Sequence, residues 1–139
     1  MNSILLVDDE AVIGAEFART LEGLGFEVEV APTVESGLAF AQAVRFDAIL
    51  VEFNLRLVPR AHPRVGNGLK VVRQFRALEV TSLILVFTAM KGELYETACF
   101  DAGADDFILK TTSFPCLVSR LRAHIRRCEQ RSWNPVGPA

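Results

Sequence analysis

The chain has 139 residues, of which 50% are apolar and 23% charged, and its formal net charge is −2. These values suffice for one domain with a substantial core, and they argue against a dedicated nucleic-acid or membrane binder. No apolar stretch approaches the roughly 20 residues of a membrane-spanning helix, and the first residues do not resemble a secretion signal. We therefore expect a soluble, cytoplasmic protein without a membrane segment and without a DNA-binding domain.

The pattern of apolar residues predicts five strands that alternate with five helices. Gly25 and Gly103 are placed to end the first and fourth helices, and Thr33 is placed to cap the second. We expect a domain over residues 1–128, and a flexible tail over 129–139 because that segment holds two prolines and a glycine. The expected strands are 4–7, 26–30, 47–52, 83–87 and 107–109, and the expected helices are 10–24, 33–44, 68–78, 91–102 and 114–127.

This alternation predicts an α/β fold, because a strand, a helix and the next parallel strand form a right-handed crossover. We expect a flavodoxin-like, doubly wound sheet of five parallel strands in the order 2-1-3-4-5. The first and third strands then lie together at the centre. Open sheets of this kind place their sites where the strand order reverses, which is between these two strands.

Polar residues follow the expected strands at the point where each strand ends. Asp8 and Asp9 follow the first strand, Glu52 ends the third, Thr88 follows the fourth and Lys110 the fifth. Because the carboxyl ends of parallel strands meet at one edge, we expect these side chains to share a pocket. Three converging carboxylates would repel one another, so the pocket requires a divalent ion or a close lysine.

These residues, in this order, resemble the receiver domain of two-component response regulators. The resemblance covers roughly residues 3–127 and rests on segments 4–10, 46–51, 67–69, 86–89 and 102–110. It implies a signalling module rather than an enzyme, with a histidine kinase or another signalling protein as its partner.

The resemblance also assigns roles to individual residues. It implies that Asp8 and Asp9 face Mg²⁺, with the backbone carbonyl of Asn54 as a third ligand. Thr88 and Lys110 would bind the oxygens of a phosphoryl group, and Phe107 would be an aromatic switch that moves between inward and outward states.

The chain departs from the family at the phosphoacceptor, because Glu52 stands where the family has aspartate. One more methylene moves the carboxylate by about 1.5 Å, and Mg²⁺ tolerates little deviation from octahedral contacts of about 2.0 to 2.1 Å. We therefore expect Mg²⁺ binding to be weak or absent, with Glu52 reaching towards Lys110 and Thr88. Lys110-Thr111 also replaces the family's Lys-Pro, so we expect a trans peptide bond there.

A segment of 15 residues, 53–67, lies between the third strand and the third helix, where about 2 to 6 residues are usual. Its part from 55 to 66 is an insertion beside the site with several arginines and no acidic residue. We expect Arg60 or Arg64 to neutralise the acidic pocket in part, or the segment to bind a partner.

Two hypotheses of function follow. The first is a single-domain pseudo-receiver that acts by protein–protein contact without phosphorylation, using the face formed by the fourth helix, fifth strand and last helix. A homodimer would use the same face. In this hypothesis Glu52 either biases the domain towards the active-like arrangement or simply pairs with Lys110 in an inactive-like one.

The second hypothesis is a phosphoacceptor that still takes or relays a phosphoryl group through a non-standard site. A flavin or nucleotide carrier is disfavoured, because the first strand leads into acidic residues where a phosphate would need glycines and backbone amides.

Overall fold

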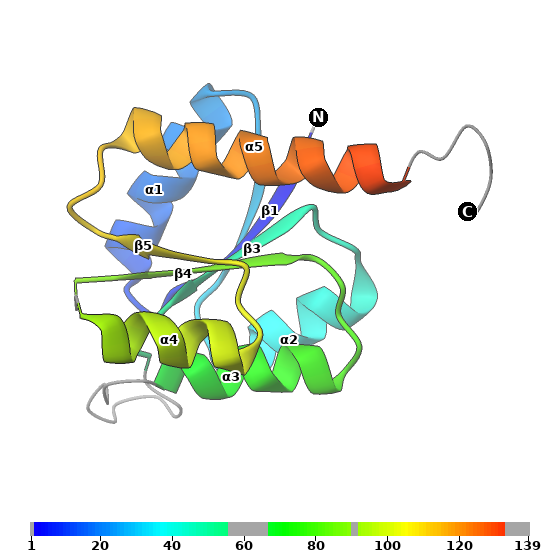
Figure 1. The fold of residues 1–139 in the computed structure, drawn as a ribbon. Helices are drawn as coiled ribbons and strands as arrows, with labels where there is room; N and C mark the ends of the chain where they lie inside the picture. Colours follow the sequence, from blue (N-terminus) through cyan, green and yellow to red (C-terminus); the bar gives the residue numbers. More distant parts are fainter. Residues whose placement is uncertain (1, 56–66, 90–91, 133–139) are drawn as a thin grey trace.

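The computed structural model describes residues 2–55, 67–89 and 92–132 (Figure 1). Strands and helices alternate along the whole described chain, as expected. The strands are β1 (Ser3–Val7), β2 (Glu27–Ala31), β3 (Ala48–Glu52), β4 (Leu83–Thr88) and β5 (Asp106–Leu109). The helices are α1 (Ala11–Gly23), α2 (Val34–Ala43), α3 (Asn67–Ala77), α4 (Glu93–Ala102) and α5 (Phe114–Ser132).

The five strands form one parallel sheet in the order β2-β1-β3-β4-β5, which confirms the flavodoxin-like fold. Helices α1 and α5 cover one face of the sheet, and α2, α3 and α4 cover the other (Figure 1). Val7 lies beside Val51, and Glu52 lies beside Phe87. This register brings the carboxyl ends of β1, β3 and β4 to one edge, where open sheets of this kind place their sites.

The central strand β3 is buried on both faces, which explains its unbroken apolar run. Ile49 and Val51 belong to the core under α2, α3 and α4. Ala48 and Leu50 belong to the core under α1 and α5. Glu52 ends the strand with 5% of its surface exposed, so its carboxylate is largely removed from solvent.

The predicted helix caps are present. The Thr33 hydroxyl accepts a hydrogen bond from Ser36 N at 3.0 Å, and the Ser36 hydroxyl accepts one from Thr33 N at 3.2 Å. Gly25 and Gly103 follow α1 and α4 with φ of 97° and 114°, a region that favours glycine. No described peptide bond is cis, so the Lys110-Thr111 bond is trans.

Helix α5 is longer than we expected. We placed the end of the last helix near residue 127, but α5 continues to Ser132. Residues 129–132 are therefore helical and do not belong to the expected tail, whose remainder lies outside the described residues. The sequence Glu129-Gln130-Arg131 consists of good helix formers, and these outweigh the turn signals that follow. Among the described helices, none combines the length and apolar character needed to cross a membrane.

A candidate signalling site at the carboxyl edge of the sheet

A small cavity of about 60 Å³ lies where β1 and β3 end. It gathers five of the seven residues that the sequence singled out, with Lys110 facing the acidic side chains. Its lining consists of Asp8, Asp9, Glu10, Ile13, Glu52, Asn54 and Lys110.

Asp8 is the most enclosed acid of the β1 turn, with 3% of its surface exposed. Its backbone N donates to Ala31 O at 3.2 Å, and its Oδ1 accepts from Glu10 N at 3.0 Å. Burial raises the pKa of the Asp8 carboxyl, although the Glu10 N–H and the charge of Lys110 act in the opposite direction. Keeping the Asp8 carboxyl ionised in this pocket therefore costs free energy.

Glu52 and Lys110 form an ion pair within the site. Lys110 Nζ lies 2.7 Å from Glu52 Oε2, and Asn54 N donates to Glu52 Oε1 at 3.4 Å. The Lys110 side chain is 41% exposed and the Glu52 side chain is 7% exposed, so solvent reaches the ammonium but hardly reaches the carboxylate. Burial raises the pKa of Glu52, and the Lys110 ammonium is the main opposing influence.

Lys110 makes two further contacts besides its ion pair with Glu52. Its ammonium lies 5.4 Å from the centre of the Phe87 ring, within the range of a cation–π contact. Its backbone N donates to Thr88 O at 2.8 Å, which joins the ends of β4 and β5. The sequence did not indicate a role for Phe87, because an aromatic residue in a strand is typical of the core. Its contact with Lys110 depends on the pairing of β4 with β5.

Thr88 and Phe107 do not line the acidic cavity. Thr88 ends β4 and is fully buried. Phe107 is 8% exposed and belongs to the core under α2, α3 and α4, so its ring lies inward. It borders a separate hollow of about 570 Å³, which Glu96 and Arg120 also line. The expected roles of Thr88 and Phe107 in switching remain predictions.

The start of α3 supports the strand end that carries Glu52. Gly68 N donates to Phe53 O at 2.8 Å, and Asn67 Nδ2 donates to Leu55 O at 2.7 Å. The α carbon of Gly68 is so near the chain that an added Cβ would collide with Glu52 O and Phe53. Segment 67–69 was recognised only as part of the family pattern, and the close approach gives it a physical reason.

The donor set does not fit a Mg²⁺ site of the kind that the resemblance implies. Glu52 is engaged by Lys110 and by Asn54 N, and Asp8 Oδ1 by Glu10 N–H. Over the described ranges, no group of three or more His, Cys, Asp or Glu side chains is arranged to hold a metal ion. The carboxylates of Asp8 and Asp9 remain at the cavity, and the Asn54 carbonyl as a third ligand remains a prediction.

We therefore predict that Mg²⁺ or Mn²⁺ binds no more tightly than millimolar. Two carboxylates beside an ammonium offer less attraction than a three-ligand site. Titration calorimetry on the wild type and on Asp9→Ala checks this. A micromolar constant that Asp9→Ala abolishes would show that the metal site is intact.

We predict that Asp8→Asn stabilises the fold near neutral pH by about 1 kcal/mol. A carboxyl whose pKa is raised in the folded state binds its proton more tightly there than in the unfolded chain. Its contribution to stability therefore falls as pH rises from the ordinary value of 3.8 through the folded pKa. Asparagine removes this loss and can still accept the Glu10 N–H.

The measurement is the melting temperature of both proteins across pH 3 to 8. The gain should shrink as the pH falls to the ordinary value of an aspartate, 3.8. Glu16→Gln, at an exposed position in the middle of α1, is the control and should change the melting temperature little. A variant less stable than the wild type at pH 7 would contradict the argument.

An acidic pocket with an opposing lysine, at the reversal point of a doubly wound sheet, defines a class of signal-receiving domains. The sequence profile of the response regulator receiver domain matches residues 4–122, and the chain belongs to that family. The arginine-rich insertion, including Arg60 and Arg64, lies outside the described residues, so its expected role stays a prediction.

Several relatives illustrate the range of the family. The chain is 32% identical over 132 residues to response regulator ArlR of Staphylococcus saprophyticus, covering 95% of this chain and 56% of that protein. It is 37% identical to a probable transcriptional regulatory protein of Picosynechococcus, covering 89% and 49%. The chain thus spans about half the length of the curated relatives it matches.

Solved structures show the same fold. A CheY-like receiver domain protein from Methanospirillum hungatei superposes with a TM-score of 0.80 at 24% identity, covering 94% of this chain and 98% of that one. A Burkholderia pseudomallei response regulator, whose structure holds a phosphorylated aspartic acid, a calcium ion and citrate, gives a TM-score of 0.74 at 24% identity. That match covers 98% of this chain and 76% of the other.

Proposed function

We propose that this receiver domain transmits its signal by protein–protein contact, without phosphorylation of a side chain. The observation that carries the proposal is the 2.7 Å ion pair between Glu52 and Lys110. It places the carboxylate at the acceptor position against a group that would bind a phosphoryl oxygen. Asn54 N donates to the other oxygen, so both oxygens of the Glu52 carboxylate are already in contact with a donor.

The Glu52–Lys110 pair supplies part of what a phosphoryl group would supply. A carboxylate carries one charge, whereas a phosphoryl group carries nearly two at neutral pH. Because the Lys110 side chain is exposed to solvent, the ion pair contributes less to the stability of this arrangement than a fully buried pair would. We therefore infer a partial bias towards the active-like arrangement, and about 1.4 kcal/mol would already change a two-state ratio tenfold.

Phe107 and Thr88 are the residues whose positions would report this bias. The Phe107 ring lies inward and Thr88 is fully buried at the end of β4. In the competing proposal Glu52 pairs with Lys110 in an inactive-like state, and both residues are indifferent to the carboxylate.

The proposed output surface is the face formed by α4, β5 and α5. On α4, Leu94 is 86% exposed and Phe100 is 44% exposed, so two large apolar side chains are accessible to a partner there. On β5 and α5, Asp106 Oδ1 lies 3.6 Å from Arg120 NH1. We propose that a histidine kinase or another cytoplasmic signalling protein reads the domain, and that a homodimer would use this face.

Acetyl phosphate tests whether the site takes a phosphoryl group. The wild type and Glu52→Asp are incubated with acetyl phosphate and Mg²⁺, and the intact mass is measured. We expect no added phosphoryl group on the wild type and a phosphoryl group on the aspartate variant, whose shorter side chain restores the acceptor. A phosphorylated wild type would favour the alternative, a phosphoacceptor with a non-standard site.

The Glu52→Gln variant tests the bias itself. Glutamine keeps the size of the side chain but removes its charge, so the attraction to Lys110 is lost. We expect the NMR signals of Thr88 and Phe107 to shift towards a second state, with weaker partner binding. If both signals and the binding stay unchanged, the Glu52 carboxylate does not set the switch.

A further inference from the structure

We propose that a second cavity, between α1 and α5, binds an uncharged small molecule with an aromatic ring. This inference goes beyond the signalling role proposed above, because it assigns a ligand to a part of the chain outside the acidic cavity. It rests on the volume and lining of the second cavity, on its partly exposed apolar walls and on the ion pair of the lysine at its border.

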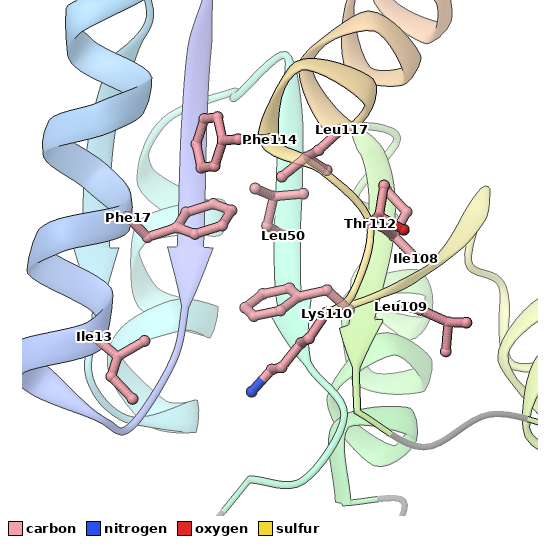
Figure 2. Close-up of a pocket in the computed structure, with 10 residues that line it drawn as sticks. Ile13, Phe17, Leu50, Ile108, Leu109, Lys110, Thr112, Phe114 and Leu117 are labelled. Carbon is pink, nitrogen blue, oxygen red and sulfur yellow. The ribbon is translucent and has the colours of Figure 1, made fainter.

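The cavity has a volume of about 340 Å³, within the range of about 300 to 1,000 Å³ of small-molecule sites. Figure 2 shows Ile13 and Phe17 on α1 facing Phe114 and Lys110 across the opening. Eight of the ten lining residues are apolar, and the other two are Thr112 and Lys110. Such a predominantly apolar lining is usual for ligand sites.

The walls of the cavity are apolar side chains that solvent still reaches. Ile13 is 50% exposed, and Phe17 and Phe114 are only partly buried at the edge of the core under α1 and α5. Leu50 and Ile108, in contrast, are buried and close the floor. A molecule that enters this space removes the exposed apolar surface of the walls from water, which favours binding in proportion to the area covered.

Three phenylalanine rings favour an aromatic ligand. Phe17 stacks on Phe87 with ring centres 5.6 Å apart and 6° between the planes. Phe17 also meets Phe114 at 5.2 Å and 59°. Because aromatic pairs gain free energy beyond the burial of their area, a planar aromatic ring placed against these rings would extend the cluster favourably.

The ion pair of Lys110, which is the charged residue of the lining, disfavours a ligand of either charge. The Lys110 ammonium lies 2.7 Å from Glu52 Oε2 and 5.4 Å from the centre of the Phe87 ring. A cationic ligand would approach this ammonium and be repelled. An anionic ligand would compete with Glu52 for it and leave the buried Glu52 carboxylate without its ion pair, which costs free energy.

An uncharged ligand avoids both of these costs. A charged group in the apolar part of the cavity would also lose its hydration without a compensating partner. The hydroxyl of Thr112, in the lining, can donate to or accept from a neutral polar substituent. The cavity therefore suits an aromatic ring that carries at most a small neutral polar group.

A matched series of probes tests the preference for an uncharged ligand on the full chain by ¹H–¹⁵N NMR titration at neutral pH. The probes are benzyl alcohol, which is neutral, benzylamine, which is cationic, and benzoate, which is anionic. We expect benzyl alcohol to shift the signals of Phe17, Thr112 and Phe114. It should bind about tenfold more tightly than either charged probe.

The variant Phe17→Leu tests the preference for an aromatic ring. Leucine keeps an apolar side chain but removes one ring of the cluster. The variant should weaken the binding of benzyl alcohol about fivefold relative to that of cyclohexylmethanol, as the loss of about 1 kcal/mol for one aromatic pair requires. The saturated probe corrects for the change in apolar contact. Equal losses for the two probes would overturn the assignment of an aromatic ligand.

Two tryptophan variants locate the site. Ile13→Trp fills the opening and should weaken the binding of benzyl alcohol about tenfold or more. Val12→Trp is the control, because Val12 is 73% exposed and does not line the cavity, and it should leave binding unchanged. Equal binding of the neutral and charged probes, equal effects of the two tryptophan variants, or no binding of benzyl alcohol would each overturn the proposal.

Discussion

Replacing Arg76 with methionine is expected to lower the free energy of unfolding by about 3 kcal/mol, because one side chain ties three loop carbonyls together. Arg76 Nε donates to Gly103 O at 3.0 Å, and NH1 donates to Val80 O and Ser82 O at 2.8 Å each. Methionine keeps most of the apolar stem but leaves those carbonyls without their donors. The ion pair with Asp105 is partly exposed and adds less.

Arg73→Met is the matched control for this prediction, since Arg73 lies on the same helix and is exposed. It should change stability by less than about 0.5 kcal/mol. Urea unfolding at neutral pH measures both. Arg76→Lys should recover only part of the loss, because an ammonium cannot reach the acceptors that a planar guanidinium reaches. Equal stabilities of the Met variants would contradict the argument.

Gly68→Ala is expected to destabilise the fold by a similar amount, about 3 kcal/mol, by forcing α3 away from the end of β3. The added Cβ would lie 2.9 Å from Phe53 Cα and 2.9 Å from Phe53 O, and it would collide with Glu52 O. These are backbone atoms, which cannot turn aside as the tip of a side chain can. Because Glu52 itself is displaced, the contact with Lys110 should weaken as well.

Gly23→Ala is the control, because a Cβ there meets nothing within 4 Å and its φ is ordinary. Alanine in this helix position should be neutral or stabilising by up to about 1 kcal/mol. Thermal unfolding compares the two variants, and the NMR signals of Asn54 and Lys110 report on the site. If Gly68→Ala has the same melting temperature as the wild type, the close approach of α3 to the end of β3 does not exclude a side chain at position 68.

The sequence was sufficient to predict the sheet order and four of the five side chains expected in the acidic pocket, whereas the fifth, Thr88, does not line it. Strands that end abruptly in Asp8, Glu52 or Lys110 can meet only at one edge once the strands are parallel. Those predictions depend on local patterns and on topology, and both follow from the order of residues along the chain.

Other features could not be predicted, because they depend on packing between distant segments. On α1, Gly14 and Ala18 are buried together with Leu21, whereas Ile13 is 50% exposed and Phe17 is only partly buried against Phe87. Small residues leave no apolar signal, so their burial is invisible to a periodicity argument. The contacts of Arg76 could not be predicted either, because its acceptors are backbone oxygens of the loop between α3 and β4 and of Gly103 after α4.

The extended α5 has a mechanical consequence. Its 19 residues make a rod of about 28 Å, and its first turn begins four positions after Lys110. Beyond Cys128, the positions through Arg131 are exposed, so the far end is held by the helix alone. A tilt of about 10° at the first turn would carry the last turn through about 5 Å. Leu117, Leu121 and Ile125 pack the helix against the sheet, so a displacement of that contact would be carried to the exposed last turn.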